Sequence, residues 1–246
     1  MGSAPVLTWR KARRPASRSR SIMKYRDRTD AGRRLAVELA ALKGDDVVVL
    51  ALPRGGVPVA AEIAAALGAP LDLVLVRKIG VPDQPELAMG AVVDGELPQI
   101  VRNPKIIRQA GVDADTFDRV MKAELAEIAR RRALYLGCRP RVRIAGRVAI
   151  VVDDGLATGA TATAALRAVR RLDPRHLILA VPVAAAATLA TLAAEADAIV
   201  CPEPQQRLHA VGSFYEDFTQ TTDAEVRAIL ARCPVVPAGK ERDSGD

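Results

Sequence analysis

The sequence has few aromatic residues, few cysteines and no long apolar run. Phe, Trp and Tyr make up 3% of its 246 residues, so a core must be built from Ala, Val, Leu and Ile within a hydrophobic fraction of 50%. Three widely spaced cysteines predict neither a disulfide framework nor a zinc site, and they indicate a reducing compartment. No apolar run reaches the roughly 20 residues that span a bilayer, and the basic N-terminus lacks the apolar stretch of a secretory signal. These absences favour a cytoplasmic protein without a membrane partner.

The net charge of +7 is concentrated at the N-terminus. Residues 1–22 hold six of the 36 basic residues and no acidic residue, which leaves 30 basic against 29 acidic residues in the rest of the chain. This near balance argues against a nucleic-acid partner for the folded part. The segment 1–22 is rich in Arg, Ser, Ala and Pro without periodicity, and it is predicted to be a disordered basic tail. We expect one domain over residues 23–233 and a frayed C-terminus over 234–246.

The most informative stretch covers residues 148–161 and reads VAIVVDDGLATGAT. Its apolar, mostly β-branched start predicts a buried strand, which ends in the adjacent carboxylates of Asp153 and Asp154. A turn of small residues follows, and residues 160–171 are predicted to form a helix. The stretch therefore predicts a strand, a glycine-containing loop and a helix in succession.

The loop before this helix is predicted to bind a phosphate. The first turn of a helix leaves backbone N–H groups free and carries partial positive charge, and Thr158 and Thr161 add hydroxyl donors. Because carboxylates repel phosphate, Asp153 and Asp154 should hold another part of the same ligand. Ribose hydroxyls, or a magnesium ion bound to them, are the natural candidates.

A second loop of similar kind, PRGG over residues 53–56, follows a predicted strand over 47–52 and precedes a predicted helix over 57–67. Its glycines allow the backbone to approach a ligand closely, and Arg54 can bind an anion. Taken alone, the loop also fits an ordinary tight turn between a strand and a helix.

The next apolar run, over residues 71–76, is predicted to be another buried strand that ends in Arg77 and Lys78. Two cations at the end of a strand close to the predicted phosphate loops favour phosphate binding over a solvated edge. Residues 80–96 are rich in Gly, Pro and acids, and they are predicted to form a long flexible loop with a short hairpin around 91–93.

Strands and helices alternate along the chain, which predicts a doubly wound, mainly parallel sheet covered on both faces. Both phosphate loops then lie at the carboxyl ends of strands, where such sheets bind ligands. A long helix is expected from Asp113 or Asp115 to about Tyr135, and an Ala-rich helix is expected over residues 184–194. The charged outer face of the long helix, residues 124–132, is predicted to face solvent and is a candidate contact in a homodimer.

The motif VVDDGLATGAT resembles the signature of type I phosphoribosyltransferases, which bind phosphoribosyl pyrophosphate (PRPP): a hydrophobic strand, two acids and then T-G-x-T. The PRGG loop looks like the pyrophosphate loop of the same family, and VRKIGVP resembles a strand end and mobile loop of its adenine-specific members. The resemblance implies the doubly wound fold with a flexible loop, an inserted helix and a small C-terminal hood. It also implies Mg²⁺, PRPP and a small nitrogenous acceptor as ligands.

The resemblance further implies a role for each motif residue. Asp153 and Asp154 take the ribose and the metal, and both count as catalytic. The pyrophosphate contacts are Arg54, Gly55, Gly56 and Lys78. The 5′-phosphate contacts are Ala157, Thr158, Gly159, Ala160 and Thr161.

The acceptor is less defined than PRPP. Hypoxanthine–guanine enzymes carry an aspartate immediately before T-G that acts on the purine, and here that position is Ala157, which weakens the case for a 6-oxopurine. Glu86 is the loop carboxylate that could assist the base, although a solvated loop acid fits equally well. Phe214 and Tyr215 fall where the family's hood lies, so they are predicted either to stack on the acceptor or to pin the final helix.

Three functions fit the motifs to different degrees. A phosphoribosyltransferase that moves ribose-5-phosphate from PRPP to a nitrogen nucleophile accounts for every motif. A non-catalytic PRPP-binding regulator would keep the same motifs, but no helix-turn-helix module is evident before residue 28. A hydrolase of phosphorylated sugars or nucleotides would use the two acids as magnesium ligands and leave PRGG and T-G-x-T unexplained.

Overall fold

The computed structural model describes residues 24–95 and 98–233, so the expectations for the 1–22 tail and the 234–246 C-terminus lie outside the described residues. At its centre is a sheet of strands in the order β2-β1-β6-β7-β9, and every pairing in it is parallel. The strands are β1 (Val47–Ala51), β2 (Leu71–Leu73), β6 (Val148–Val152), β7 (His176–Ala180) and β9 (Ala198–Val200). The predicted parallel sheet is therefore confirmed.

Both faces of this sheet are buried, which explains its continuous apolar strands. Successive side chains of β1 alternate between two hydrophobic clusters: Val47 and Val49 pack on one face, and Val48 and Leu50 pack on the other. The strands β6 and β7 alternate in the same way. A strand buried on both sides carries no polar alternation, so its period is invisible in the sequence while its burial is obvious.

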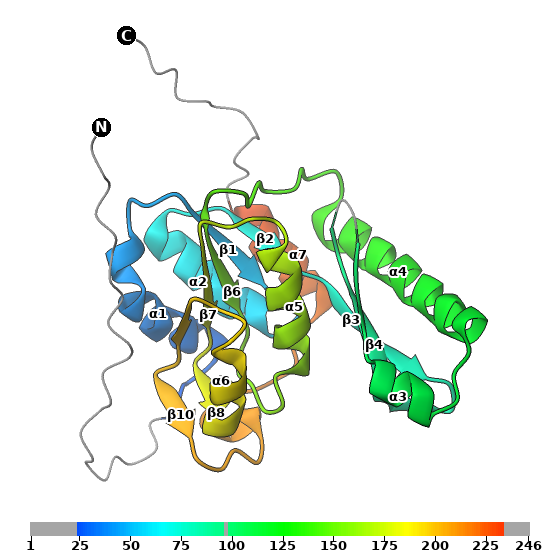
Figure 1. Cartoon of the computed structure of the whole chain (residues 1–246). Coiled ribbons are helices and arrows are strands. Elements are labelled where there is room, and N and C mark those ends of the chain that lie inside the picture. The colour runs from blue at the N-terminus through cyan, green and yellow to red at the C-terminus, as the bar shows by residue number, and fades with distance from the viewer. Residues whose placement is uncertain (1–23, 96–97, 234–246) are drawn as a thin grey trace, which may run out of the picture.

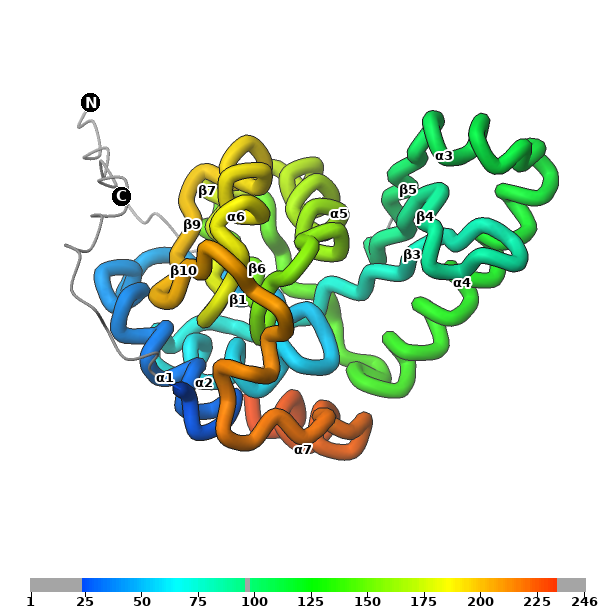
Figure 2. The backbone as a smooth tube through the Cα atoms, turned by 90° about the horizontal axis from the view of Figure 1, so that it is seen from below, coloured from blue at the N-terminus to red at the C-terminus, as the bar shows by residue number. Residues whose placement is uncertain are grey.

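Helices cover the two faces (Figure 1). The first face carries α1 (Arg28–Glu38), α2 (Gly56–Leu67) and α7 (Asp223–Arg232), and the second face carries α5 (Ala160–Arg170). A short 3₁₀ turn, η1 (Ala40–Leu42), follows α1. Seen from below, α7 lies across the edge from which the phosphate loops emerge, beside α2 (Figure 2).

The segment between β2 and β6 differs from its prediction. The strand expected over 71–76 leaves the parallel sheet after Leu73, and the chain enters a separate antiparallel sheet of β3 (Val76–Val81), β4 (Gln84–Val93) and β5 (Gln99–Arg102). The long loop expected over 80–96 is therefore wrong in its described part, because most of it is the β3–β4 hairpin.

Tertiary packing accounts for this hairpin. Ile79, Met89 and Val92 are fully buried and pack into the same cluster as Phe117 of α4 (Ala114–Leu136). Gly, Pro and acidic residues in the segment suggest a loop, but its apolar residues become strand residues once a long helix covers them. The short α3 (Pro104–Gln109) follows β5, and Asn103 caps its first turn.

The long helix α4 begins where its sequence predicted, with Asp113 as its N-cap. Its outer face is less solvated than expected. Arg132 is only 15% exposed and donates to the buried carboxylate of Asp94, which also binds Arg141. Glu124 accepts a hydrogen bond from Arg77 of β3 at 2.6 Å. These ion pairs attach the antiparallel unit to α4, so part of the charged face is internal.

The Ala-rich helix expected over 184–194 is shorter than predicted. Residues Val183–Ala185 form strand β8, and α6 covers only Ala186–Leu192. The strand β8 pairs in parallel with β10 (Glu203–Gln205), and a 3₁₀ turn, η2 (Val211–Phe214), follows. This part of the chain is the segment expected to form a small hood.

Two composition-based expectations can be compared with the described residues. All three cysteines, Cys138, Cys201 and Cys233, are free thiols in the structure. Across residues 24–95 and 98–233, no helix combines the length and the apolar character needed to cross a membrane.

Candidate active site

The two predicted phosphate loops lie side by side. Strands β1 and β6 pair in register, with Ala51 opposite Val152, so the loops that follow them leave the sheet together. The amide of Leu52 continues the ladder by donating to the carbonyl of Val152 at 2.9 Å. The order of strands in the sheet therefore brings residues about 100 positions apart in sequence to one edge.

The PRGG loop approaches the acidic pair so closely that two of its positions require glycine. A Cβ atom built on Gly55 would collide with the carboxylate of Asp154, and one built on Gly56 would lie 2.6 Å from the carbonyl oxygen of Val152. The peptide bond between Pro53 and Arg54 is cis. The glycines thus allow the pyrophosphate loop and the ribose acids predicted from the motif to form one site.

Asp154 is held by several parts of the chain. Its Oδ2 atom accepts a hydrogen bond from Nε of Arg28 at 2.8 Å, and its carbonyl oxygen accepts one from the hydroxyl of Tyr215 at 2.6 Å. The backbone N–H of Asp154 donates to Oδ1 of Asp153 at 2.9 Å. The first turn of α1 and the segment after η2 therefore both meet at this acid.

Burial and mutual repulsion dominate the electrostatics of the acidic pair. Desolvation and the neighbouring carboxylate of Asp154 raise the pKa of Asp153 well above its ordinary value. Desolvation likewise raises the pKa of Asp154, and the guanidinium of Arg28 partly offsets that rise. Two partly buried carboxylates with an excess of negative charge favour a bound cation or hydroxyl donors.

The donor chemistry of the site fits magnesium. Within the described part of the chain, no group of three or more His, Cys, Asp or Glu side chains is arranged to hold a metal by itself. Mg²⁺ usually keeps several waters and binds to one or two carboxylates together with substrate phosphates. Asp153 and Asp154 supply such a pair, so a magnesium ion would be shared with the ligand.

The 5′-phosphate loop has the predicted form. Gly159 has a φ of +73° and stands at the N-cap of α5 without any side chain that caps the helix. By contrast, α1, α3, α4 and α7 have side-chain caps, from Asp27, Asn103, Asp113 and Thr222. The first amides of α5 therefore remain free to donate to an anion.

The other residues of this loop are arranged around those amides. Ala157, Thr158 and Ala160 are exposed, whereas Thr161 is half-buried. A Cβ atom on Gly159 would lie 2.6 Å from Cγ2 of Thr188, and the hydroxyl of Thr188 donates to the carbonyl oxygen of Ala157. Helix α6 thus supports the loop from behind and leaves its outer side open.

The cations expected to bind pyrophosphate lie in a more solvated setting. Arg54 is paired with Asp223, the first residue of α7, at 3.5 Å, and their side chains are 35% and 44% exposed. Asp223 also accepts a hydrogen bond from the hydroxyl of Tyr135 at 2.7 Å, which together with burial raises the pKa of Tyr135 to about 12. Lys78 on β3 is half exposed, and its only described ion pair, with Glu86, is 3.9 Å long.

The structure places the three residues predicted to act on the acceptor in different surroundings. Glu86 lies on the β3–β4 hairpin beside Lys78, and its side chain is 95% exposed. Phe214 and Tyr215 are 6% and 4% exposed and belong to a small buried cluster with Tyr25, Ala31 and Val183. Their stacking role stays a prediction, and their burial supports the alternative that they pin this part of the chain.

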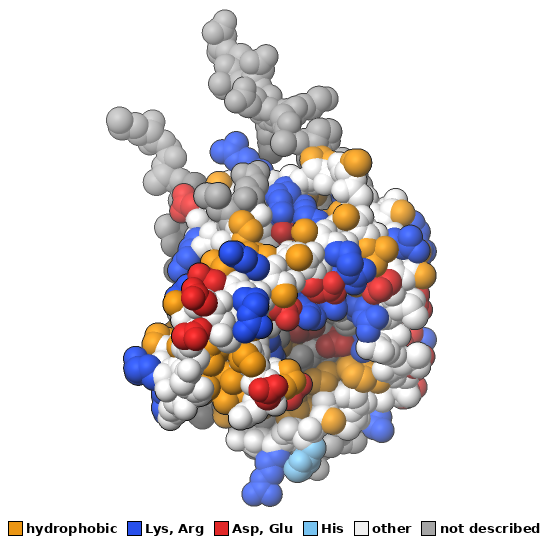
Figure 3. All heavy atoms as spheres, turned by 90° about the vertical axis from the view of Figure 1, so that its right-hand side faces the viewer, with side chains coloured by type: hydrophobic (Ala, Val, Ile, Leu, Met, Phe, Trp, Pro, Cys, Tyr) orange, Lys and Arg blue, Asp and Glu red, His pale blue; other side chains and the backbone are white. Residues whose placement is uncertain are grey.

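A cavity of about 340 Å³ separates the antiparallel sheet from α5. Its walls include Lys78 and Ala91 on the sheet side and Ala160, Thr161 and Arg167 on the helix side. Figure 3 shows the face of the molecule that carries the antiparallel unit, where basic and acidic side chains are interspersed around a hollow. The cavity places Lys78 and the 5′-phosphate loop on the walls of one space.

Sequence reasoning missed three residues of this site. Arg28 and Asp223 stand at the first positions of α1 and α7, and Tyr135 lies near the end of α4. Their partners are far along the chain: Arg28 and Asp154 are 126 positions apart, and Tyr135 and Asp223 are 88 positions apart. No local pattern marks such residues, since a charged residue in a first helical turn fits a cap or a solvated surface equally well.

Comparison with known proteins identifies the class of this fold and site. A family model described as "Phosphoribosyl transferase domain" matches residues 21–217, which is most of the chain. The chain therefore belongs to the phosphoribosyl transferase family.

The most similar relatives refine this result. The chain is 48% identical over 208 residues to the Mycobacterium tuberculosis H37Rv protein named "Putative phosphoribosyl transferase Rv0571c", and the match covers 85% of this chain and 46% of that protein. The same values hold for the corresponding protein of M. tuberculosis strain CDC 1551, named MT0597. The chain thus spans just under half the length of these curated relatives.

Among solved structures, the crystal structure of TT1426 from Thermus thermophilus is similar throughout. It is 43% identical in sequence, with a TM-score of 0.73, and the match covers 85% of this chain and 98% of that one. A chain with this fold can therefore stand without the additional length of the mycobacterial relatives.

Proposed function

We propose that this protein transfers the ribose-5-phosphate of PRPP to a small nitrogenous acceptor and releases pyrophosphate. The observation that carries the proposal is the contact between the two loops: Gly55 of PRGG lies directly against the carboxylate of Asp154. A pyrophosphate held by the first loop would therefore lie next to a ribose held by the second. This is the arrangement that cleavage of a bond between ribose and pyrophosphate requires.

The residues divide the substrate among them. Ala157 to Thr161 hold the 5′-phosphate with the free amides of α5 and with the hydroxyls of Thr158 and Thr161. Asp153 and Asp154 accept hydrogen bonds from the ribose hydroxyls. Arg54, Lys78 and the amides of Gly55 and Gly56 bind the pyrophosphate and stabilise its growing charge as the bond breaks.

A magnesium ion on Asp153, Asp154 and the substrate would neutralise charge on the leaving pyrophosphate. The chain itself supplies position and electrostatics. Its acids stand where positive charge grows on the ribose ring, and its cations stand where negative charge grows on pyrophosphate. Water must be kept from the sugar during transfer, and the space between α5 and the antiparallel sheet is the part of the site that an acceptor or a lid could fill.

The acceptor is proposed only as a class. A small planar nitrogenous compound fits the chemistry, and Ala157 offers no carboxylate to a purine ring. We keep Glu86 as the candidate acid for the acceptor, because its carboxylate lies on the hairpin that carries Lys78 and pairs only with that lysine among the described residues.

The direct test is pyrophosphate release from PRPP in the presence of magnesium and a panel of nucleobases. A transferase releases pyrophosphate only when its acceptor is present and forms the corresponding ribonucleotide. Asp154→Asn should abolish most of this release, while Asp115→Asn, at an exposed position on α4, should leave it intact. Tight PRPP binding without turnover across the panel would instead indicate a regulator, and hydrolysis of other phosphorylated sugars without PRPP binding would indicate a hydrolase.

A further inference from the structure

Arg28 is the most buried arginine contact of the site, and none of the motifs includes it. The ion pair between its Nε and Oδ2 of Asp154 measures 2.8 Å, and the two side chains are 11% and 15% exposed. Burying an arginine at the first position of a helix costs desolvation free energy, which only good geometry and additional hydrogen bonds offset. The environment of Arg28 supplies both.

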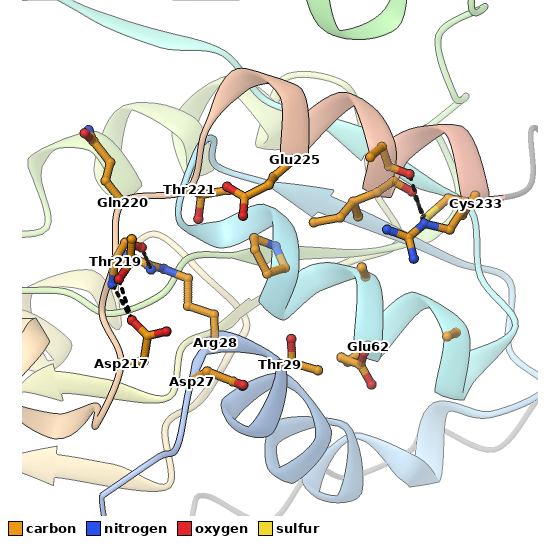
Figure 4. Close-up of a pocket in the computed structure, with 16 residues that line it drawn as sticks. Asp27, Arg28, Thr29, Glu62, Asp217, Thr219, Gln220, Thr221, Glu225 and Cys233 are labelled. Carbon is orange, nitrogen blue, oxygen red and sulfur yellow. Dashed lines mark hydrogen bonds between the residues drawn. The ribbon is translucent and has the colours of Figure 1, made fainter.

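The guanidinium has three partners from three parts of the chain. Besides Asp154, it donates through Nη1 to the carbonyl oxygen of Thr219 at 2.8 Å, and its central carbon lies 4.0 Å from the centroid of the Phe218 ring. Figure 4 shows the side chain of Arg28 extending from the start of α1 to Thr219, whose own side chain is bonded to Asp217. The ring, the carbonyl and the carboxylate leave the guanidinium a single orientation.

This orientation determines what Asp154 can offer to a ligand. Arg28 occupies Oδ2, and the hydroxyl of Tyr215 holds the backbone carbonyl of the same residue. Among the described residues, no second basic side chain forms an ion pair with this carboxylate. One of its oxygens is therefore anchored, and the other is left to accept from a ribose hydroxyl.

We propose that Arg28 is the positioning residue for the ribose of PRPP, holding Asp154 in its binding orientation through an anchor formed by Phe218 and Thr219. This proposal rests on the proposed function, since it assumes that Asp154 binds ribose. It adds that the ribose half of the site depends on residues from the start of α1 and from the segment before α7. Arg28 acts through Asp154 and does not touch the substrate.

Lysine cannot replace arginine in this role. An ammonium group is a compact charge without a planar face, so it cannot donate to a carboxylate and to a carbonyl in fixed directions while stacking on a ring. Arg28→Lys therefore keeps the charge near Asp154 and loses the orientation. The pair of variants Arg28→Lys and Arg28→Gln separates the two contributions.

The experiment measures the affinities of PRPP, ribose-5-phosphate and pyrophosphate by calorimetry for wild type and each variant. Arg28→Gln should weaken PRPP and ribose-5-phosphate by about tenfold or more, and Arg28→Lys should weaken them by a smaller factor. Pyrophosphate affinity should stay within about twofold in both variants, since Arg54 and Lys78 are untouched. In turnover, the KM for PRPP should rise more than kcat falls.

Two further variants keep the test specific. Phe218→Leu removes the ring beneath the guanidinium and should weaken ribose-5-phosphate in the same direction, with an effect that is less than additive in the double variant with Arg28→Gln. Arg33→Gln removes another arginine of α1 that pairs with a second helix, at Glu62, on the surface. It should change none of the three affinities.

The outcomes separate this proposal from the proposed function. Wild-type protein that turns over PRPP while Arg28→Gln binds ribose-5-phosphate normally would overturn the positioning role alone. Equal losses for ribose-5-phosphate and pyrophosphate would also overturn it, because they would indicate general disruption of the fold. Wild-type protein that ignores PRPP would overturn both proposals. A loss confined to the ribose ligands, larger in Arg28→Gln than in Arg28→Lys, supports the positioning role.

Discussion

The two halves of the substrate site differ in how firmly the protein holds them. On the ribose side, Asp154 is bound by Arg28 and Tyr215 at 2.8 and 2.6 Å, with side chains that are mostly buried. On the pyrophosphate side, Arg54 and Lys78 have single ion pairs of 3.5 and 3.9 Å, and both side chains are well exposed. One half is preorganised, and the other half consists of cations that can move.

The difference follows from what each half must bind. Ribose hydroxyls are neutral and directional, so a misplaced acceptor oxygen loses its hydrogen bond. Pyrophosphate carries several charges, which attract a mobile cation over a wider range of positions. Mobile cations also lose their own weak pairs at little cost when the ligand arrives, and they can release it again afterwards. The comparison predicts large effects for changes on the ribose side and small effects on the other.

Gly55→Ala should have the largest effect, because it disrupts both halves together. The added Cβ would collide with the carboxylate of Asp154, so either the PRGG loop or the acid must shift. Overpacking of this kind costs about 1–3 kcal/mol of stability, and PRPP affinity should fall on the order of 100-fold. Calorimetric titration and thermal melting measure the two quantities.

Gly68→Ala provides the matched control. Gly68 ends α2 at a φ of +67° with no atom within 4 Å of a new Cβ, so alanine adds backbone strain without a collision. This variant should lose about 1 kcal/mol of stability and keep its PRPP affinity. If both variants bind PRPP equally well, the contact between the loops is irrelevant to the ligand.

Asp154→Asn should weaken PRPP binding by about 10- to 150-fold, which corresponds to about 1.5–3 kcal/mol for a charged hydrogen bond. The amide keeps the shape of the side chain but loses the charge that Arg28 and the ribose or magnesium bind. The fold should survive, since the side chain lies at the edge of the core. Wild-type affinity in this variant would show that the ribose assignment is wrong.

Asp153 should make stability depend on pH in an unusual direction. Its pKa is raised in the folded protein by burial and by Asp154, above its ordinary value of 3.8. Below 3.8 the group is neutral in both the folded and unfolded states, and as the pH rises through the folded-state pKa the buried group must ionise and the fold loses stability. Asp153→Asn should therefore melt higher than wild type at about pH 8, with the difference shrinking toward about pH 5.

Glu127 offers the opposite sign as a control. Hydrogen bonds from Arg130 and Arg131 lower its pKa to about 2. Its ionised form stabilises the fold above the ordinary value of 4.5, and that contribution is lost as the pH falls through the folded-state pKa. Glu127→Gln should thus melt slightly lower than wild type at neutral pH and equally at low pH. Parallel pH curves for the variants of Asp153 and Glu127 would contradict the burial of charge at the site.

Lys78→Ala should have the smallest effect of this series. Its side chain is half exposed, so losing its attraction for pyrophosphate should weaken PRPP by about three- to tenfold. Ribose-5-phosphate binding should be unchanged. Equal losses for both ligands would move this lysine to the 5′-phosphate or to a structural role, and Glu86→Gln, which removes its partner, should lower kcat without changing PRPP affinity if Glu86 serves the acceptor.

Several features of this protein could be predicted from local sequence alone. The apolar strands β1, β6 and β7 were recognisable because burial on both faces leaves no polar residue in their interior. The loops after β1 and β6 were recognisable because close approach to a phosphate requires glycine and small residues. The start of α4 was recognisable from Asp113, whose side chain caps the helix locally. In each case the physical cause lies within a few residues of the feature.

Other features depended on residues far away, and the sequence could not reveal them. Residues 76–93 form a hairpin because α4 covers their apolar side chains, although their composition is that of a loop. Arg28 reaches Asp154, and Asp223 reaches Arg54, across distances along the chain that no local pattern spans. Sequence therefore determined which backbone segments could bind phosphate and ribose. The packing of α1, α4 and α7 decided which side chains support those segments, since burial and ion pairing depend on the neighbours that the folded chain brings together.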